Sequence, residues 1–124
     1  MPVPILKQGD VLIASIQSAL TDQDLIRLRD EVADRVGRLR SRGVIIDVTA
    51  LDVLDSFATR TLRLIAYTAK LRGAPTVVVG IQPDVAFAMV QLGLCLDGVV
   101  TALDLEEGLV HLSSVAKRGT RRAR

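Results

Sequence analysis

Ser56 is the residue whose type and position best suit a chemical modification. It lies in the run Leu54-Asp55-Ser56-Phe57, at the expected start of a helix. A serine there acts either as a helix N-cap or as an exposed hydroxyl that accepts a phosphoryl group. The unpaired N–H groups of a helix N-terminus stabilise added negative charge by about 0.3–1 kcal/mol. Asp52 and Asp55 would repel a phosphate of about −1.5 to −2 charge. This balance favours a binding switch over a catalyst.

Asp47 is a second candidate, at the end of the expected strand 44–48. An aspartate at this place is typical of receiver domains, which also need an acidic pair after the first strand and a lysine after the last. The segment 11–17 has no acid, and no lysine lies between Lys70 and Lys117. We therefore expect Asp47 to accept backbone hydrogen bonds rather than a phosphoryl group.

Other catalytic chemistry finds little support in the sequence. Cys95 is the one cysteine and His111 the one histidine, so no intrachain disulfide or cysteine-based zinc site is expected, and we expect Cys95 to be a small buried thiol. Neither a Gly-x-Ser-x-Gly elbow nor a glycine-rich phosphate loop is present. We predict no catalytic residue, no metal site and no cofactor.

Turn residues divide the chain into alternating strands and helices. Thr21 and Asp104 look like helix N-caps, and Pro83 suits the first turn of a helix. The order strand, strand, then helix and strand in alternation predicts one α/β domain with a mostly parallel sheet and about four helices. A short strand is expected before Gln8, followed by strands at 11–16, 44–48, 76–79 and 99–101. Helices are expected from Thr21 up to Gly43, from near Asp55-Ser56 to Gly73, from Pro83 to Gly93, and from Asp104 through Leu112.

Charge and composition limit the class of protein. Five of the 16 Lys and Arg residues lie in 117–124, so residues 1–116 carry 11 bases against 14 acids. The acidic balance of residues 1–116 and their few aromatic side chains predict that this domain does not bind nucleic acid specifically. The aromatic residues are Phe57, Tyr67 and Phe87. No apolar run has the roughly 18 residues that span a bilayer. We expect a cytoplasmic protein without a membrane partner, folded over 1–116, with a basic, disordered tail over 117–124.

Partner contacts are expected where the parallel strands end, because open α/β sheets bind at that edge. The residues expected at that edge are Asp47, the loop up to Ser56 and the run Gly80-Ile81-Gln82-Pro83. Gln82 either belongs to a plain strand-to-helix turn or also contacts a partner. Phe57 suits both core packing and an interface.

Four segments together resemble STAS domains, the fold of anti-sigma factor antagonists, and within them the small stressosome scaffolds of the RsbS type. They are Pro4–Lys7, Val44–Thr49 with Leu54–Phe57, Gly80–Pro83 and Thr101–Glu106. The resemblance extends over about residues 2–116 and implies phosphorylation of Ser56. Thr59 and Thr61 would be further hydroxyl candidates, but nothing in the resemblance matches them to the modified position.

The resemblance also implies partners. It predicts a switch kinase of the RsbT type that the unphosphorylated scaffold sequesters, and RsbR-type STAS paralogues that join it in a large homo- or hetero-oligomer. A phosphatase would reset the serine. We expect Asp55, Ser56, Phe57 and Gln82 to form the partner-binding surface.

Two other functions remain open from the sequence. The first is a monomeric anti-anti-sigma factor that binds an anti-sigma kinase, which the absence of a large assembly with a paralogue would favour. The second is a small nucleotide-binding or phosphotransfer enzyme. Nucleotide turnover that is lost in Asp47→Ala would favour the enzyme.

Overall fold

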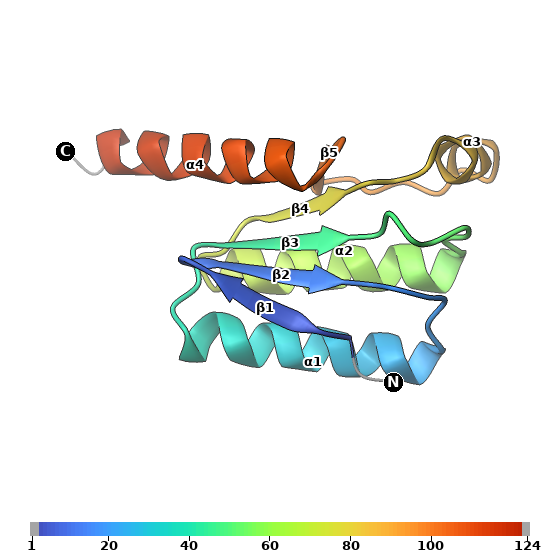
Figure 1. The fold of residues 1–124 in the computed structure, drawn as a ribbon, viewed down its shortest axis with the longest axis horizontal. Coiled ribbons are helices and arrows are strands. Elements are labelled where there is room, and N and C mark those ends of the chain that lie inside the picture. Colours follow the sequence, from blue (N-terminus) through green and yellow to red (C-terminus); the bar gives the residue numbers. More distant parts are fainter. Residues whose placement is uncertain (1–2, 123–124) are drawn as a thin grey trace.

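The computed structural model describes residues 3–122, and side chains within 3–116. Figure 1 shows one sheet with helices on both of its faces. The elements follow the predicted order and confirm the predicted fold class. They are β1 (Ile5–Gln8), β2 (Val11–Ser15), α1 (Asp22–Arg38), β3 (Gly43–Asp47), α2 (Ser56–Leu71), β4 (Thr76–Val79), α3 (Pro83–Gln91), β5 (Val100–Ala102) and α4 (Leu105–Arg122).

The strands lie in the sheet in the same order as in the chain, β1-β2-β3-β4-β5. β1 runs antiparallel to β2, with Ile5 opposite Ala14, and β2 to β5 are parallel. Each crossover from β2 onward therefore steps in the same direction. Because such crossovers share one hand, they place α1, α2 and α3 on the same face of the sheet. The helix after β5 is free to cover the other face.

The face under α1, α2 and α3 carries the larger part of the core. Leu28, Val32 and Leu62 come from the helices and pack with Val44 and Ile46 of β3. These side chains recur every three or four residues along the helices and at every second residue along β3, which are the helix and strand periods. Val85 and Met89 bring α3 into the same layer.

α4 covers the opposite face with Leu112, which packs on Ile13, Ile45 and Val79 among others. Two glycines permit this close approach. A Cβ at Gly43 would lie 2.8 Å from Leu112 Cδ1, and one at Gly108 would lie 2.9 Å from Val79 Cγ1. The helix therefore packs directly onto β3 and β4.

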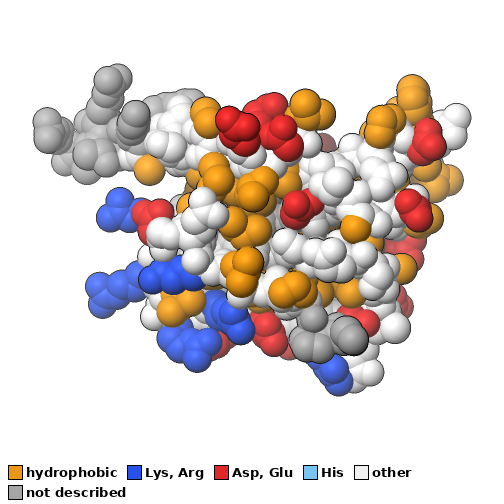
Figure 2. Space-filling view, in the orientation of Figure 1, with side chains coloured by type: hydrophobic (Ala, Val, Ile, Leu, Met, Phe, Trp, Pro, Cys, Tyr) orange, Lys and Arg blue, Asp and Glu red, His pale blue; other side chains and the backbone are white. Residues whose placement is uncertain are grey.

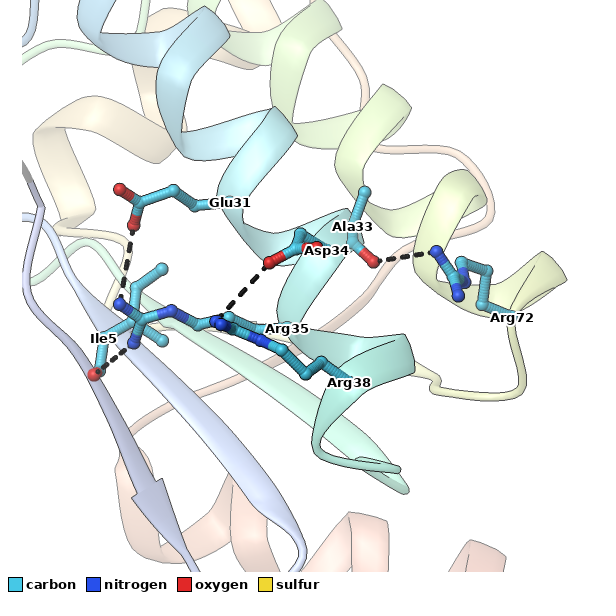
Figure 3. Close-up of polar contacts among 7 residues, drawn as sticks. All are labelled: Ile5, Glu31, Ala33, Asp34, Arg35, Arg38 and Arg72. Atoms are coloured by element: carbon cyan, nitrogen blue, oxygen red, sulfur yellow. Dashed lines mark hydrogen bonds and ion pairs between the residues drawn. The ribbon is translucent and has the colours of Figure 1, made fainter.

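Polar contacts link the C-terminal ends of α1 and α2 to their neighbours (Figure 3). Arg35 donates to the Ile5 carbonyl at 3.1 Å and connects α1 to β1, while Arg72 donates to the Ala33 carbonyl at 3.1 Å and connects α2 to α1. The absence of a side chain at Gly37 leaves room for the Arg72 guanidinium. These bonds hold α2, and hence its N-terminal residues, in a fixed position over the sheet.

Thr21 is the N-cap of α1, as the sequence predicted. Its hydroxyl accepts from the Asp24 N–H, and the Asp24 carboxylate accepts from the Thr21 N–H, both at 3.1 Å. Hydrogen bonds from the side chain and then the backbone of Thr21 lower the pKa of the Asp24 carboxyl. A carboxyl group whose pKa is lowered on folding stabilises the domain at pH values above its unfolded-state pKa. That stabilisation is lost as the pH falls through its folded-state pKa.

Two expectations need correction. Cys95 is exposed, not buried: it follows α3 in an irregular segment, where its Sγ lies 3.7 Å from an Arg63 nitrogen and 3.4 Å from Asp97 Oδ2. α4 continues past position 116 to Arg122, where we expected disorder from Lys117. A helix that is already nucleated extends at low cost, and arginine is a good helix former. Residues 123–124 of the expected tail lie outside the described residues, and the domain limit at 116 stays a prediction.

The packing of α4 predicts a large effect of Leu112→Ala. Leu112 is 6% exposed, so its truncation leaves a cavity between α4 and the sheet. We expect the free energy of unfolding to fall by about 2–5 kcal/mol in urea denaturation. Leu103→Ala is the matched control, because Leu103 is 76% exposed and should change stability by less than about 0.5 kcal/mol. Equal stability of the two variants would contradict this packing.

Candidate functional site

Asp55, not Ser56, is the N-cap of α2. Its carboxylate accepts a 2.7 Å hydrogen bond from the Ala58 N–H, and its backbone is extended. The Ser56 N-cap that we considered is therefore wrong, because both residue types are good caps and the geometry of one turn decides between neighbours. Ser56 is consequently the first helical residue and is exposed. Within the described part of the chain its hydroxyl has no hydrogen-bond partner. A reagent or enzyme can reach that hydroxyl without first breaking a bond.

Asp47 fixes the start of the loop that leads to Ser56. Its Oδ1 accepts from the Thr49 N–H at 2.9 Å and from the Thr49 hydroxyl at 2.6 Å. Gln82 donates from Nε2 to the Thr49 carbonyl at 2.6 Å and so joins the neighbouring β4–α3 loop to the same residue. Asp47 therefore has the structural role that we expected, and Thr49 is a residue that sequence reasoning missed. The Asp-x-Thr spacing, typical of an Asx turn, could have indicated it.

Gly80 lets the two loops approach each other. Its φ is +81°, and a Cβ there would clash with Thr49 Oγ1. Only glycine combines this backbone conformation with so small a volume. The structure thus brings Gln82 and the Ser56 loop to the same edge of the sheet through a shared neighbour, although no hydrogen bond joins Gln82 to Ser56 among the described residues.

The other hydroxyls of the first turns of α2 are not accessible. Thr59 is 1% exposed and donates to the Asp55 carbonyl at 2.8 Å; Thr61 is 7% exposed and donates to the Phe57 carbonyl at 2.9 Å. The spacing of Thr59 with Leu62 and Ala66 places it on the buried face of the helix. Ser56 is the accessible hydroxyl among these three.

Apolar surface flanks the start of α2. Phe57 is partly buried, so part of its ring remains available to a partner. A cavity of about 100 Å³ lies on the other side, where Ala58 and Leu62 face the β2–α1 loop. Val53, on its rim, is 71% exposed. The Ser56 hydroxyl therefore lies between two apolar surfaces, which suits a protein interface more than a small-molecule site.

The sheet order supports the same conclusion. Small ligands of open α/β sheets bind in the crevice that opens where the strand order reverses. Among the described strands the order is continuous from β1 to β5, so this sheet has no such reversal.

Residues 3–116 hold no group of three side chains suited to a metal ion, and no described helix is long and apolar enough to span a bilayer.

The carboxyl edge of the sheet is acidic. Figure 2 shows acidic and apolar side chains on the right of the view, where Figure 1 places the ends of β2 to β4, and most of the visible Lys and Arg side chains on the left. Asp52 and Asp55 are both exposed beside Ser56. A phosphate on Ser56 would add its negative charge near these two carboxylates.

The chain belongs to the STAS domain family, whose model matches residues 3–108. Within that family it is RsbS-like. A serine-to-glutamate variant of RsbS from Moorella thermoacetica is 39% identical, with a TM-score of 0.79, over 93% of this chain and 97% of that one. A chain from a structure of the stressosome, described as a signal integration and transduction hub, is also 39% identical, with a TM-score of 0.75, over 91% of this chain and 98% of that one.

Two Bacillus subtilis proteins are more distant relatives. RsbRA, an RsbT co-antagonist protein, is 24% identical over 107 residues, and RsbRD, which has the same description, is 24% identical over 82 residues. The matches cover 86% and 66% of this chain but only 38% and 30% of those proteins. The anti-sigma factor antagonist SpoIIAA, at 11% identity and a TM-score of 0.66 over 88% of this chain and 94% of that one, shares the fold alone.

The cap of α2 predicts a stability difference between two aspartates at the site. Asp55→Ala removes the acceptor of the Ala58 N–H and should lower the free energy of unfolding by about 0.5–2 kcal/mol. Asp52→Ala removes the same charge without removing a cap, and Asp55→Asn keeps a capping oxygen. Both should stay within about 0.5 kcal/mol of the wild-type value in urea denaturation. If Asp52→Ala were as destabilising as Asp55→Ala, charge rather than capping would explain the effect.

Proposed function

We propose that this protein is a non-catalytic stressosome scaffold that sequesters an RsbT-type serine kinase and releases it when Ser56 is phosphorylated. The observation that carries the proposal is the Ser56 hydroxyl, exposed and without a hydrogen bond in the described chain, at the first position of α2. The likeness to RsbS supports the scaffold role. The RsbT co-antagonists RsbRA and RsbRD support RsbT as the type of partner.

The covalent step belongs to the kinase. Ser56 Oγ attacks the γ-phosphorus of Mg-ATP bound in the kinase, the bond to ADP breaks, and the hydroxyl proton passes to a base of the kinase. This chain supplies a positioned nucleophile: the Asp55 cap fixes the first turn of α2, and the Asp47–Thr49 bonds fix the loop before it. A phosphatase that hydrolyses the phosphoserine would return the scaffold to its binding form.

Release of the kinase follows from the negative charge that phosphorylation adds to Ser56. In the complex, Ser56 and Phe57 would lie under the kinase, with Asp55 and Gln82 at the rim. A phosphate of about −1.5 to −2 charge on Ser56 would then be buried in the interface beside the carboxylates of Asp52 and Asp55. Desolvation and repulsion should weaken the interface by a few kcal/mol. The same proposal has RsbR-type paralogues assemble with this chain in a large cytoplasmic complex.

The modified residue is tested by intact mass after incubation with an RsbT-type kinase and Mg-ATP. We expect one added phosphate on the wild type and on Ser113→Ala, which removes an exposed serine of α4, and none on Ser56→Ala. Phosphate on Ser56→Ala would place the site elsewhere. Absence of phosphate on all three proteins would refute the proposal.

The charge mechanism predicts that Ser56→Asp binds the kinase at least tenfold more weakly than the wild type, equivalent to about 1.4 kcal/mol. The loss should shrink at high salt, because screening reduces repulsion between charges. Ser113→Asp carries the same substitution on a different surface and should bind as the wild type does. Dissociation constants from calorimetric titration decide it, and unchanged affinity of Ser56→Asp would exclude the electrostatic account.

A further inference from the structure

A second surface lies between α1 and α2, on the outer side of the helix pair. It is a groove of about 320 Å³, which we call the α1–α2 groove. It begins next to the phosphorylatable residue, because Phe57 is one of its walls. The lining side chains are Ile26, Arg29, Phe57, Arg60, Thr61 and Leu64.

The groove is apolar inside. Ile26 is 38% and Leu64 46% exposed, although neighbouring Leu25 and Leu28 of α1 are 5% and 2% exposed in the core. The Thr61 hydroxyl is already bonded to the Phe57 carbonyl, so it offers no unsatisfied donor to a ligand. A partner gains most here by burying an apolar side chain, at about 25 cal/mol for each Å² removed from water.

The rim of the groove is positively charged. Arg29 is held by Asp30 through an ion pair of 2.9 Å, whereas exposed Arg60 has no ion pair within the described part of the chain. Arg35 and Arg38 of α1, by contrast, each face an acid four residues earlier (Figure 3). Arg60 therefore presents an unneutralised guanidinium beside an apolar groove. Its geometry suits a carboxylate, which a guanidinium binds through two parallel hydrogen bonds.

We propose that the α1–α2 groove is a docking site for the kinase that phosphorylates Ser56. The kinase inserts an apolar side chain between Ile26 and Leu64 and places a carboxylate against Arg60, as in the binding of an amphipathic helix to a groove. The inference rests on the proposed function and extends it from the modified residue to the neighbouring surface. Phe57 joins the two, since it follows Ser56 in the chain and lines the groove.

In this arrangement, the residues that dock the kinase differ from the residue that receives the phosphoryl group. The groove binds a part of the kinase that does not react, so its loss lowers affinity and leaves the transfer step intact. Steady-state phosphorylation of Ser56 measures the two separately, because loss of uniform binding raises KM and leaves kcat unchanged. A purely structural role for these residues would instead lower the stability of the domain.

The test uses an RsbT-type kinase with Mg-ATP and two pairs of variants of the full chain. Leu64→Gln and Arg60→Glu alter the groove. Leu71→Gln and Lys70→Glu make matching changes at the far end of α2, where both residues are exposed. We expect the groove variants to raise KM about tenfold with kcat within twofold of the wild type, and the controls to leave both unchanged. Arg60→Lys, which keeps the charge but cannot form two parallel hydrogen bonds to a carboxylate, should raise KM less than Arg60→Glu does.

The outcomes separate this inference from the proposed function. Phosphorylation of Ser56 with wild-type KM in both groove variants would overturn the docking site and leave the switch intact. Equal KM increases in groove and control variants would also overturn it, because they would show a general charge or solubility effect. Absence of any phosphate on the wild type would overturn the proposed function and this inference with it. Thermal unfolding of each variant confirms that the domain is folded.

Discussion

The two central strands of this sheet are buried on both faces, and the other elements are arranged around that requirement. Ile45, Ile46, Val77 and Val78 are each 0% exposed, so neither face of β3 or β4 meets water. Parallel strands of this kind are stable only when helices cover both sides. The crossover helices cover one side, and α4 covers the other. Placement of the loops at the carboxyl edge, and of Ser56 with them, follows from this arrangement.

The edge of the sheet that carries Ser56 is held in place by a network of hydrogen bonds. Thr49 is its central residue: Asp47 holds its N–H and hydroxyl, Gln82 binds its carbonyl, and Gly80 lies against its side chain. This network fixes the loop before α2. The Ser56 hydroxyl is exposed at this edge, and under the proposed function a single added charge there changes the complementarity to a partner.

The sequence predicted the element order because hydrophobic periodicity and turn residues agree along the whole chain. Prediction from the sequence was less reliable where two neighbouring residues were both suitable helix N-caps, or where an apolar run lay outside a helix or strand. Asp55 and Ser56 are both capping types, and the geometry of one turn decides between them. Cys95 lies between two leucines, a pattern typical of burial, but the segment runs along the surface. The α1–α2 groove depends on how two helices separated by 17 residues pack, which no local pattern encodes.

The dependence of the second face on α4 has a consequence for the order of folding during synthesis. A chain emerges from the ribosome N-terminal end first, at about 5–20 residues per second. The strands and the first three helices precede α4, so they can associate while Ile13, Ile45 and Val79 still face solvent. Until Leu112 leaves the exit tunnel, the nascent domain exposes an apolar sheet face. A chaperone would therefore be expected to capture this domain in the interval before α4 packs onto the sheet.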